Sequence, residues 1–184
     1  MFNNVGVGLK PAPTLNHLRM GLLRPGIVLA LLVTWGCMQP AEQRFSQTFS
    51  SPEALASQVV LALKTRDRTL LESLPLTERE FEDEVYPEMP AAKSVPAAYV
   101  WGDLRQKSTN ALARALHNHG GRDYDVAAVR FDGGHTSYRT FVVHRKPRLI
   151  VFDRQSGRER HLAILGSILQ YGGRYKLFSY VVNR

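Results

Sequence analysis

The fold class rests on residues 97–131, AAYVWGDLRQKSTNALARALHNHGGRDYDVAAVRF, where the spacing of the apolar side chains changes. The first part has apolar residues at helical spacing and ends at Gly120-Gly121, a typical helix stop. From Tyr124 onward apolar and polar residues alternate, as they do in a half-buried strand. We therefore expect a long helix over 97–119, followed directly by β-structure.

Upstream of this helix, capping patterns and prolines predict three shorter helices. In Ser50-Ser51-Pro52-Glu53 the capping serine stands three residues ahead of the glutamate, with proline at an early helical position, and Thr77 with Glu80 forms a second capping box. The expected helices cover residues 52–65, 66–74 and 77–86.

Downstream, the period-2 pattern predicts a meander of strands separated by short turns rich in glycine or proline. The expected strands cover residues 124–131, 138–145, 148–153, 160–171 and 174–183. The predicted fold class is α+β: a single domain over residues 51–184 in which N-terminal helices pack on a curved antiparallel sheet of four to five strands.

The amino-terminal segment has the charge pattern of an exported protein. Residues 1–40 carry three basic side chains and no acidic one, and the apolar run 26–33 is shorter than the roughly 18 to 20 residues that span a bilayer. We expect a signal peptide over 1–36. Met20 stands just before the charged and apolar regions, so it is an alternative start of the chain.

The single cysteine follows the apolar run in Val33-Thr34-Trp35-Gly36-Cys37. This arrangement resembles the lipobox of bacterial lipoproteins. The resemblance implies cleavage before Cys37, attachment of acyl chains to that cysteine, and an exported protein anchored to a membrane of a bacterial cell envelope. Residues 37–50 would then be the lipidated cysteine and a flexible tether.

The order of elements over residues 50–184 resembles the nuclear transport factor 2-like superfamily. That resemblance implies a cone in which the long helix and the concave face of the sheet enclose a pocket. The superfamily contains isomerases and dehydratases as well as non-catalytic binding domains, so the fold leaves the function open.

Few polar or aromatic side chains are placed to line such a pocket. Near the start of the long helix they are Tyr99, Trp101 and Asp103, although a large aromatic such as Trp101 more often packs into a core. On the strand 138–145, Tyr138 and His144 share one face, and that face completes the candidate set.

The histidines and acids give no motif for metal binding or catalysis. His117 and His119 are two residues apart on a helix, a spacing that cannot form a shared metal site. The acids that could point inward, Glu80, Glu84 and Asp103, have no partner whose spacing demands a catalytic role. We expect no metal and no cofactor.

The charge is concentrated in the strand half of the chain. Residues 121–184 hold twelve basic and five acidic side chains, whereas residues 41–120 hold nine basic and eleven acidic ones. A basic sheet surface favours anionic lipid head groups or envelope polymers, unless its charges serve only to keep the sheet soluble. Nucleic acid is not expected as the partner of an exported protein.

Together these features predict an exported, lipid-anchored cell-envelope protein that acts as a non-catalytic binding or interaction module. Its ligand would be an anionic polymer or a small hydrophobic molecule. One alternative is an isomerase- or dehydratase-like enzyme that uses the cone interior. The other is a homodimeric assembly protein, with an exposed apolar patch formed by residues such as Leu165, Tyr175 and Leu177.

Overall fold

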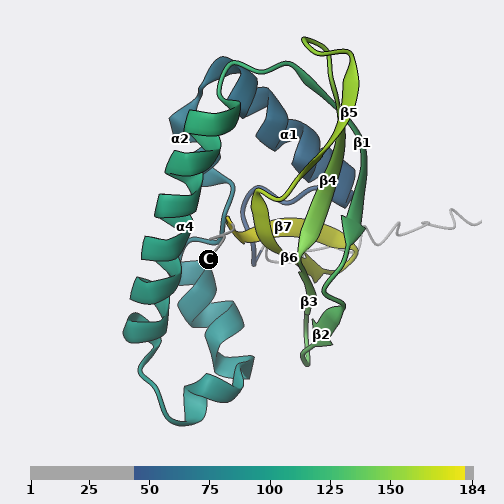
Figure 1. Cartoon of the computed structure of the whole chain (residues 1–184). Helices are drawn as coiled ribbons and strands as arrows, with labels where there is room; N and C mark the ends of the chain where they lie inside the picture. The colour runs from purple at the N-terminus through teal and green to yellow at the C-terminus, as the bar shows by residue number, and fades with distance from the viewer. Residues whose placement is uncertain (1–43, 181–184) are drawn as a thin grey trace, which may run out of the picture. The chain divides into compact units, whose positions relative to one another are not determined.

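The structure is a computed structural model that describes residues 44–180. The described chain is α+β, as predicted: helices come first, and antiparallel strands follow (Figure 1). The predicted signal peptide, the alternative start at Met20 and the lipidation site Cys37 lie outside the described residues.

The helical part consists of four α-helices and three short turns of other helical types within the described range. The α-helices are α1 (Pro52–Thr65), α2 (Arg68–Ser73), α3 (Glu78–Glu80) and α4 (Ala97–His119). A π-helical turn, η1 (Phe81–Val85), follows α3 directly, and two 3₁₀ turns, η2 (Tyr86–Glu88) and η3 (Pro90–Lys93), lead to α4.

The predicted start of the first helix is confirmed, but its cap is Ser51 rather than Ser50. The Ser51 hydroxyl accepts a hydrogen bond from the Ala54 N–H, and Glu53 accepts one from the Val129 N–H instead of closing a capping box. Thr77 and Glu80 form the expected reciprocal capping box. The predicted end of the long helix is confirmed as well. At the C-terminus of α4 the Gly120 N–H donates to the Leu116 carbonyl, and Gly121 has a positive φ of 81° that favours glycine.

The third predicted helix differs from the expectation beyond Glu80, because the chain changes to a π-turn and passes through Pro87 in η2. Residues five apart share a face of a π-turn, which brings the rings of Phe81 and Tyr86 to a centroid distance of 5.7 Å. Phe81, Val85 and Tyr86 are all buried. Packing of these three side chains therefore outweighs the regular helical hydrogen bonding.

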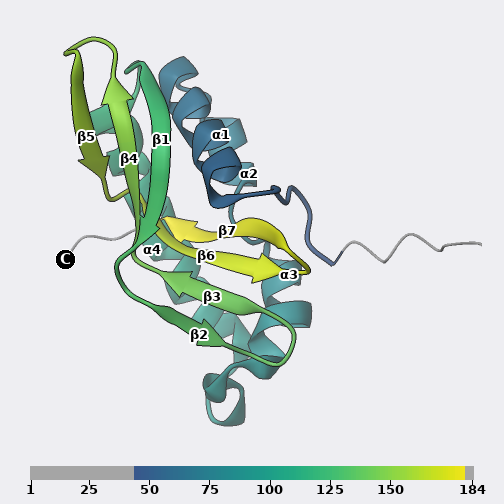
Figure 2. The ribbon, with the colours of Figure 1, turned by 90° about the vertical axis from the view of Figure 1, so that its right-hand side faces the viewer.

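The strands form two antiparallel sheets rather than the single sheet that was expected. One has the order β1-β4-β5 and the other β2-β3-β6-β7 (Figure 2). The strands are β1 (Tyr124–Phe131), β2 (His135–Ser137), β3 (Val142–Arg145), β4 (Pro147–Asp153), β5 (Arg158–Leu162), β6 (Leu165–Tyr171) and β7 (Arg174–Tyr180).

Bends in the chain account for the difference. The predicted strand 160–171 is interrupted at residues 163–164, so that β5 pairs in one sheet and β6 in the other. Between β3 and β4, Lys146 has a φ of 49°, and the chain again passes from one sheet to the other. The prediction over 138–145 was wrong in its first half, because the Tyr138 N–H donates to the Phe141 carbonyl in a turn that joins β2 to β3.

Two hydrophobic clusters hold these layers together. The larger joins α1, α2 and the C-terminal half of α4 to both sheets, and Leu55, Leu149 and Leu177 lie fully buried in it. The smaller joins η1 to β3 and β6 through Phe81, Val143 and Leu169, among others.

Residues 45–49, expected in the tether, pack onto the domain. The Phe45 side chain is buried, with its ring 5.4 Å from that of Tyr171. Phe49 exchanges two backbone hydrogen bonds of 2.8 Å with Tyr175 of β7. The packed part of the chain therefore includes Phe45, six residues before the expected boundary at Ser51. Within residues 44–180, no helix has both the length and the apolar character needed to cross a bilayer.

Candidate functional site

A groove lies between α4 and β7, and it follows from how α4 packs. The N-terminal half of α4, from Ala97 to Asn110, has no fully buried residue, whereas Ala111, Leu112 and Ala115 in the second half are buried. Trp101 and Leu104 in the first half pack, half-buried, against the smaller hydrophobic cluster, and a groove of about 390 Å³ lies beside them. Its lining comes from α4, β7 and the segment after α2: Glu72, Pro75, Leu76, Thr77, Trp101, Leu104, Arg105, Ser108, Thr109, Leu112, Phe178 and Tyr180.

Tyr180 ties together the three elements around the groove. Its backbone N–H donates to the Ser108 hydroxyl of α4 at 3.1 Å, and its phenol donates to the Leu71 carbonyl of α2 at 2.8 Å. Burial raises the pKa of the Tyr180 phenol far above its ordinary value, so this hydroxyl stays a donor. Beside it, the Leu76 N–H donates to the Leu177 carbonyl and holds the segment after α2 against β7.

Trp101 contributes the unusual feature of the groove. Its ring packs against Phe81 with a centroid distance of 5.4 Å, while the side chain as a whole is half-buried. The indole N–H is shielded from solvent and has no hydrogen-bond acceptor among the residues that the structure describes. A buried donor without an acceptor costs about 1–3 kcal/mol, so this N–H weakens the packing around Trp101.

Arg105 lies at the rim of the groove. No carboxylate in the described part of the chain forms an ion pair with it. Glu72, also on the rim, forms an ion pair with Arg68 at 2.7 Å. The groove thus combines apolar side chains, among them Leu104 and Phe178, with an arginine at its rim. This lining suits an apolar molecule with an anionic oxygen.

The structure places one of the five predicted pocket residues, Trp101, in this groove. Tyr138 stacks on Phe141 at 4.6 Å and packs on the smaller hydrophobic cluster. Tyr99 is 74% exposed, and Asp103 is exposed in an ion pair with Lys107 on the solvent side of α4. The expected set is therefore not brought together.

His144, the fifth of these residues, lies in a separate cluster on the other face of the second sheet. Its Nε2 is 2.8 Å from the Gln170 side-chain oxygen, and its ring is 4.7 Å from that of Phe131. Of the patch expected for the homodimer, Leu165 and Leu177 are fully buried in the larger hydrophobic cluster. These two leucines cannot form a surface for a second copy.

A second polar site surrounds a buried ion pair that the sequence analysis missed. The Nζ of Lys176 on β7 lies 3.3 Å from Oε2 of Glu80 and donates to the Ser46 carbonyl at 2.8 Å. Glu80 also accepts hydrogen bonds from Ser46, through its N–H and its hydroxyl, and from the Thr77 N–H.

The environment shifts the pKa values of both partners. Burial acts to raise the pKa of Glu80, but the hydrogen bonds from Thr77 and Ser46 and the charge of Lys176 outweigh it, and the pKa is lowered. Burial lowers the pKa of Lys176, against the opposing effect of Glu80. The Lys176 side chain is fully enclosed, so no substrate reaches its amine.

A charged groove of about 580 Å³ borders Glu80 on its outer side. Its arginines are each paired with an acid: Arg44 with Glu84 at 3.5 Å, Arg79 with Asp83 at 3.3 Å, and Arg139 with Glu88 at 3.7 Å. Because the charges satisfy one another, this groove is a weaker candidate than the one that contains Trp101.

The residues that build the Trp101 groove had only a partial signal in the sequence. Leu104 and Leu112 belong to the apolar residues at helical spacing that predicted the long helix, whereas Phe178 and Tyr180 lie in the predicted strand 174–183 without any sign of a pocket. Within residues 44–180, the structure gathers no group of three or more histidine, cysteine, aspartate or glutamate side chains that could hold a metal ion. No family model matches the chain, and neither the curated proteins nor the solved structures give a match to it.

Proposed function

We propose that this chain is an exported, lipid-anchored protein of a bacterial cell envelope, whose domain is a non-catalytic module that binds a small hydrophobic ligand. The ligand lies in the groove between α4 and β7. The observation that carries this proposal is the groove itself, about 390 Å³ in volume, with Leu104 and Phe178 in its lining and the Arg105 cation at its rim.

The position of the groove also supports a cone of the nuclear transport factor 2-like kind. The groove lies between the long helix α4 and a strand of the bent β-structure that follows it, where that superfamily has its pocket. The likeness is one of element order, and it bears on the place of the ligand rather than on its identity.

Binding is favoured over catalysis by the groups that line the groove. Its ionisable side chains other than the tyrosine are Glu72 and Arg105, both exposed at the rim. An isomerase-like site needs a carboxylate or histidine in the apolar interior. The buried pair Glu80 and Lys176 does not line this groove.

Ligand binding can be tested with Trp101 itself as the reporter. In a chain cleaved before Cys37, Trp101 is the only tryptophan, because the other one is Trp35. We expect decanoate to change the Trp101 fluorescence saturably. Decylamine, which has the same chain length but no anionic acceptor, should bind more weakly, since it meets the Arg105 cation instead of pairing with it.

Variants separate binding in the groove from binding elsewhere. Trp101→Phe, followed by calorimetry, and Arg105→Gln should each weaken decanoate binding, whereas Tyr99→Phe on the exposed side of α4 should not. Equal binding of decanoate by all three variants would show that the groove is not the ligand site.

The lipid anchor has its own test. The full chain is produced in a bacterium that receives an alkyne-tagged palmitate, and the protein is examined for the tag and for membrane association. We expect both in the wild type and neither in Cys37→Ser. A wild-type chain that remains untagged would contradict the lipoprotein assignment, independently of the groove.

A further inference from the structure

The two sheets have four edge strands among the described residues: β1 and β5 in the first sheet, β2 and β7 in the second. An edge strand presents backbone N–H and C=O groups that need partners. Three of these edges are accounted for. The β7 edge is covered by Phe49 and Leu76, whose N–H groups donate to carbonyls of that strand, and β2 is only three residues long.

The β1 edge is capped by a side chain of α1. The Glu53 carboxylate accepts a hydrogen bond from the Val129 N–H of β1 at 3.1 Å. The fourth edge strand, β5, pairs with β4 alone in the described part of the chain. The outer edge of this five-residue strand is open in the described part of the chain, and it lies at the margin of the first sheet (Figure 2).

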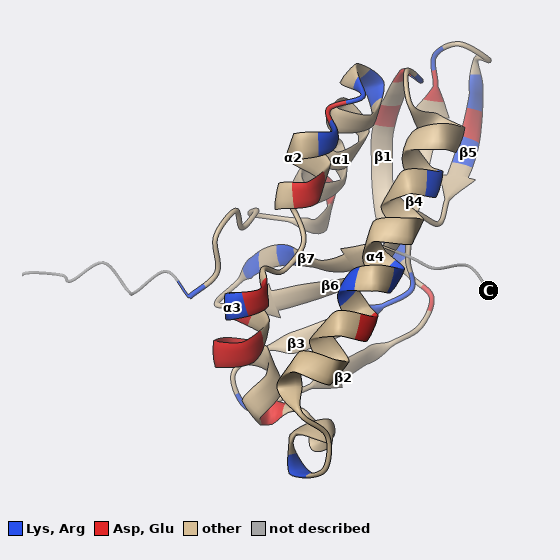
Figure 3. Cartoon of the chain, turned by 90° about the vertical axis from the view of Figure 1, so that its left-hand side faces the viewer, with Lys and Arg blue, Asp and Glu red and all other residues tan. Residues whose placement is uncertain are grey.

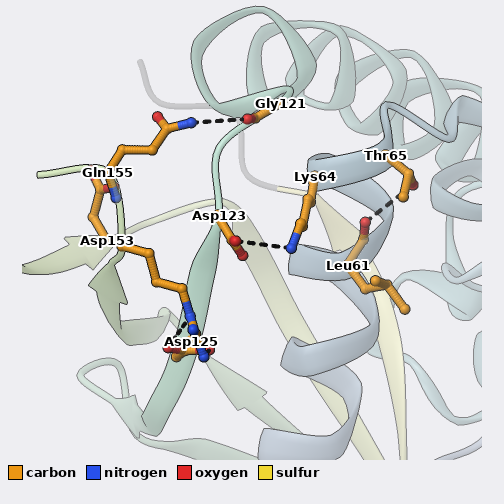
Figure 4. A network of polar contacts seen from close by, with 9 residues as sticks. Leu61, Lys64, Thr65, Gly121, Asp123, Asp125, Asp153 and Gln155 are labelled. Carbon is orange, nitrogen blue, oxygen red and sulfur yellow. Dashed lines mark hydrogen bonds and ion pairs between the residues drawn. The ribbon is translucent and has the colours of Figure 1, made fainter. Parts of the chain in front are cut away.

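The β5 strand is held firmly by the hairpin that leads into it. Asp153 accepts hydrogen bonds from the Gln155 and Ser156 N–H groups in the turn, and Gln155 donates to the Gly121 carbonyl at 3.3 Å (Figure 4). Arg154 forms a two-point ion pair with Asp125 on β1. A strand fixed in this way offers its edge without a large loss of conformational entropy on binding.

The β5 strand carries two arginines, Arg158 and Arg160, and one acid, Glu159, and their side chains are exposed. Figure 3 shows β5 with basic segments on either side of an acidic one. Arg160 pairs with the buried Asp153 but keeps 48% of its side chain exposed. Arg158 has no carboxylate partner within the described residues. Positive charges along an edge strand also discourage aggregation. They disfavour pairing with neutral or basic strands, whereas an acidic strand would be attracted to them.

A second copy of this chain fits the edge poorly. An antiparallel pairing of two β5 strands centred on Arg160 places two arginines directly opposite each other, which is destabilising. The excess of twelve basic over five acidic side chains in residues 121–184 adds a long-range repulsion between copies.

We propose that the outer edge of β5 binds an extended acidic segment of another protein, which adds to the first sheet as a further strand. Backbone hydrogen bonds to β5 supply the pairing, and Arg158 and Arg160 select glutamate or aspartate at alternate positions of the segment. This site is separate from the groove that contains Trp101 and does not depend on its ligand.

The test uses the full chain and a labelled peptide of alternating valine and glutamate, with a matched peptide of valine and lysine. We expect the acidic peptide to bind, more weakly as salt rises, and the basic one not to bind. Arg158→Glu should weaken binding at least about fivefold, since it replaces an attraction by a repulsion. Arg130→Glu, the same change at an exposed position of β1, is the control.

Amide hydrogen exchange distinguishes strand addition from simple charge attraction. On binding, alternate amides of residues 158–162 should become protected. Arg158→Gln, a milder change, should reduce peptide affinity in the same direction and so covers the case in which Arg158→Glu misfolds. Peptide binding without protection of these amides would overturn the proposal, as would equal binding of the basic peptide. An equal loss of peptide affinity in Arg130→Glu would overturn it too. Protection of β5 that rises with protein concentration in the absence of peptide would also overturn it, because it would indicate pairing between two copies of the chain.

Discussion

Lys176 on β7 and Glu80 at the end of α3 form an ion pair of 3.3 Å from which solvent is almost entirely excluded. Ser46 bonds to both partners, with its carbonyl toward Lys176 and its N–H toward Glu80. The pair therefore joins the N-terminal segment, the helical layer and the second sheet at one point.

Removal of either charge alone should destabilise the domain. Lys176→Met leaves the Glu80 carboxylate buried without its cation, for which we expect a loss of about 3–5 kcal/mol in the free energy of unfolding. The double variant Lys176→Met/Glu80→Gln should recover part of this loss. Urea unfolding measures both, and Lys107→Met, which breaks the exposed pair with Asp103, should change stability by less than about 0.5 kcal/mol.

The same pair predicts a dependence of stability on pH. Folding lowers the pKa of Glu80, so its contribution to stability is complete well above 4.5, the value in the unfolded chain, and is lost as the pH falls through the folded pKa. We expect the free energy of unfolding to decrease as acid is added below about pH 5. In Glu80→Gln the free energy of unfolding should depend less on pH in this range. If the dependence were unchanged in that variant, other carboxylates would be responsible for the loss of stability in acid.

Two glycines should respond in opposite directions to replacement by alanine. At Gly166 an added Cβ would lie 2.7 Å from the Ser179 hydroxyl and 2.9 Å from the Ser179 carbonyl oxygen, too close without a backbone shift. Gly166→Ala should therefore cost about 1–3 kcal/mol. Gly102 in α4 has no atom within 4 Å of that position, and Gly102→Ala should stabilise the helix by about 1 kcal/mol. Thermal unfolding distinguishes the two.

The hydroxyl of Tyr180 should matter for stability as well as for the groove. Tyr180→Phe removes its hydrogen bond to the Leu71 carbonyl and leaves a buried acceptor unsatisfied, at a cost of about 1–3 kcal/mol. Tyr99→Phe on the exposed face of α4 is the control and should have no measurable effect on urea unfolding. If Tyr180→Phe changed the free energy of unfolding as little as Tyr99→Phe, the buried hydrogen bond would contribute little to stability.

The order of the helices and strands could be predicted because its signals are local. Ser51, the Thr77–Glu80 capping box and the glycines after His119 each act within one turn of helix, so their effect needs no knowledge of the rest of the chain. The alternation of apolar and polar residues after Tyr124 is also a local signal. It indicates a strand with one buried face, whichever part of the protein covers that face.

The candidate site could be predicted only in part. Trp101 was expected near a pocket because it opens the long helix, and it does line the groove. His144 was expected to face the same pocket, but residues 138–141 bend into a turn before β3, and its ring lies beside Gln170 and Phe131 instead. A face assignment within one strand holds only until the chain bends, and nothing local marks a bend that packing imposes.

The sequence by itself determined the α+β class, the helix starts, and the basic character of the strand half, since each follows from neighbouring residues or from composition. Only the tertiary structure decided where the strands divide into two sheets, that Lys176 is buried, and that the edge of β5 is open. A lysine in a strand reads as exposed until a carboxylate and a carbonyl from distant segments, Glu80 and Ser46, enclose it. Such contacts join residues far apart in the chain, so their free energy has no counterpart in any local pattern.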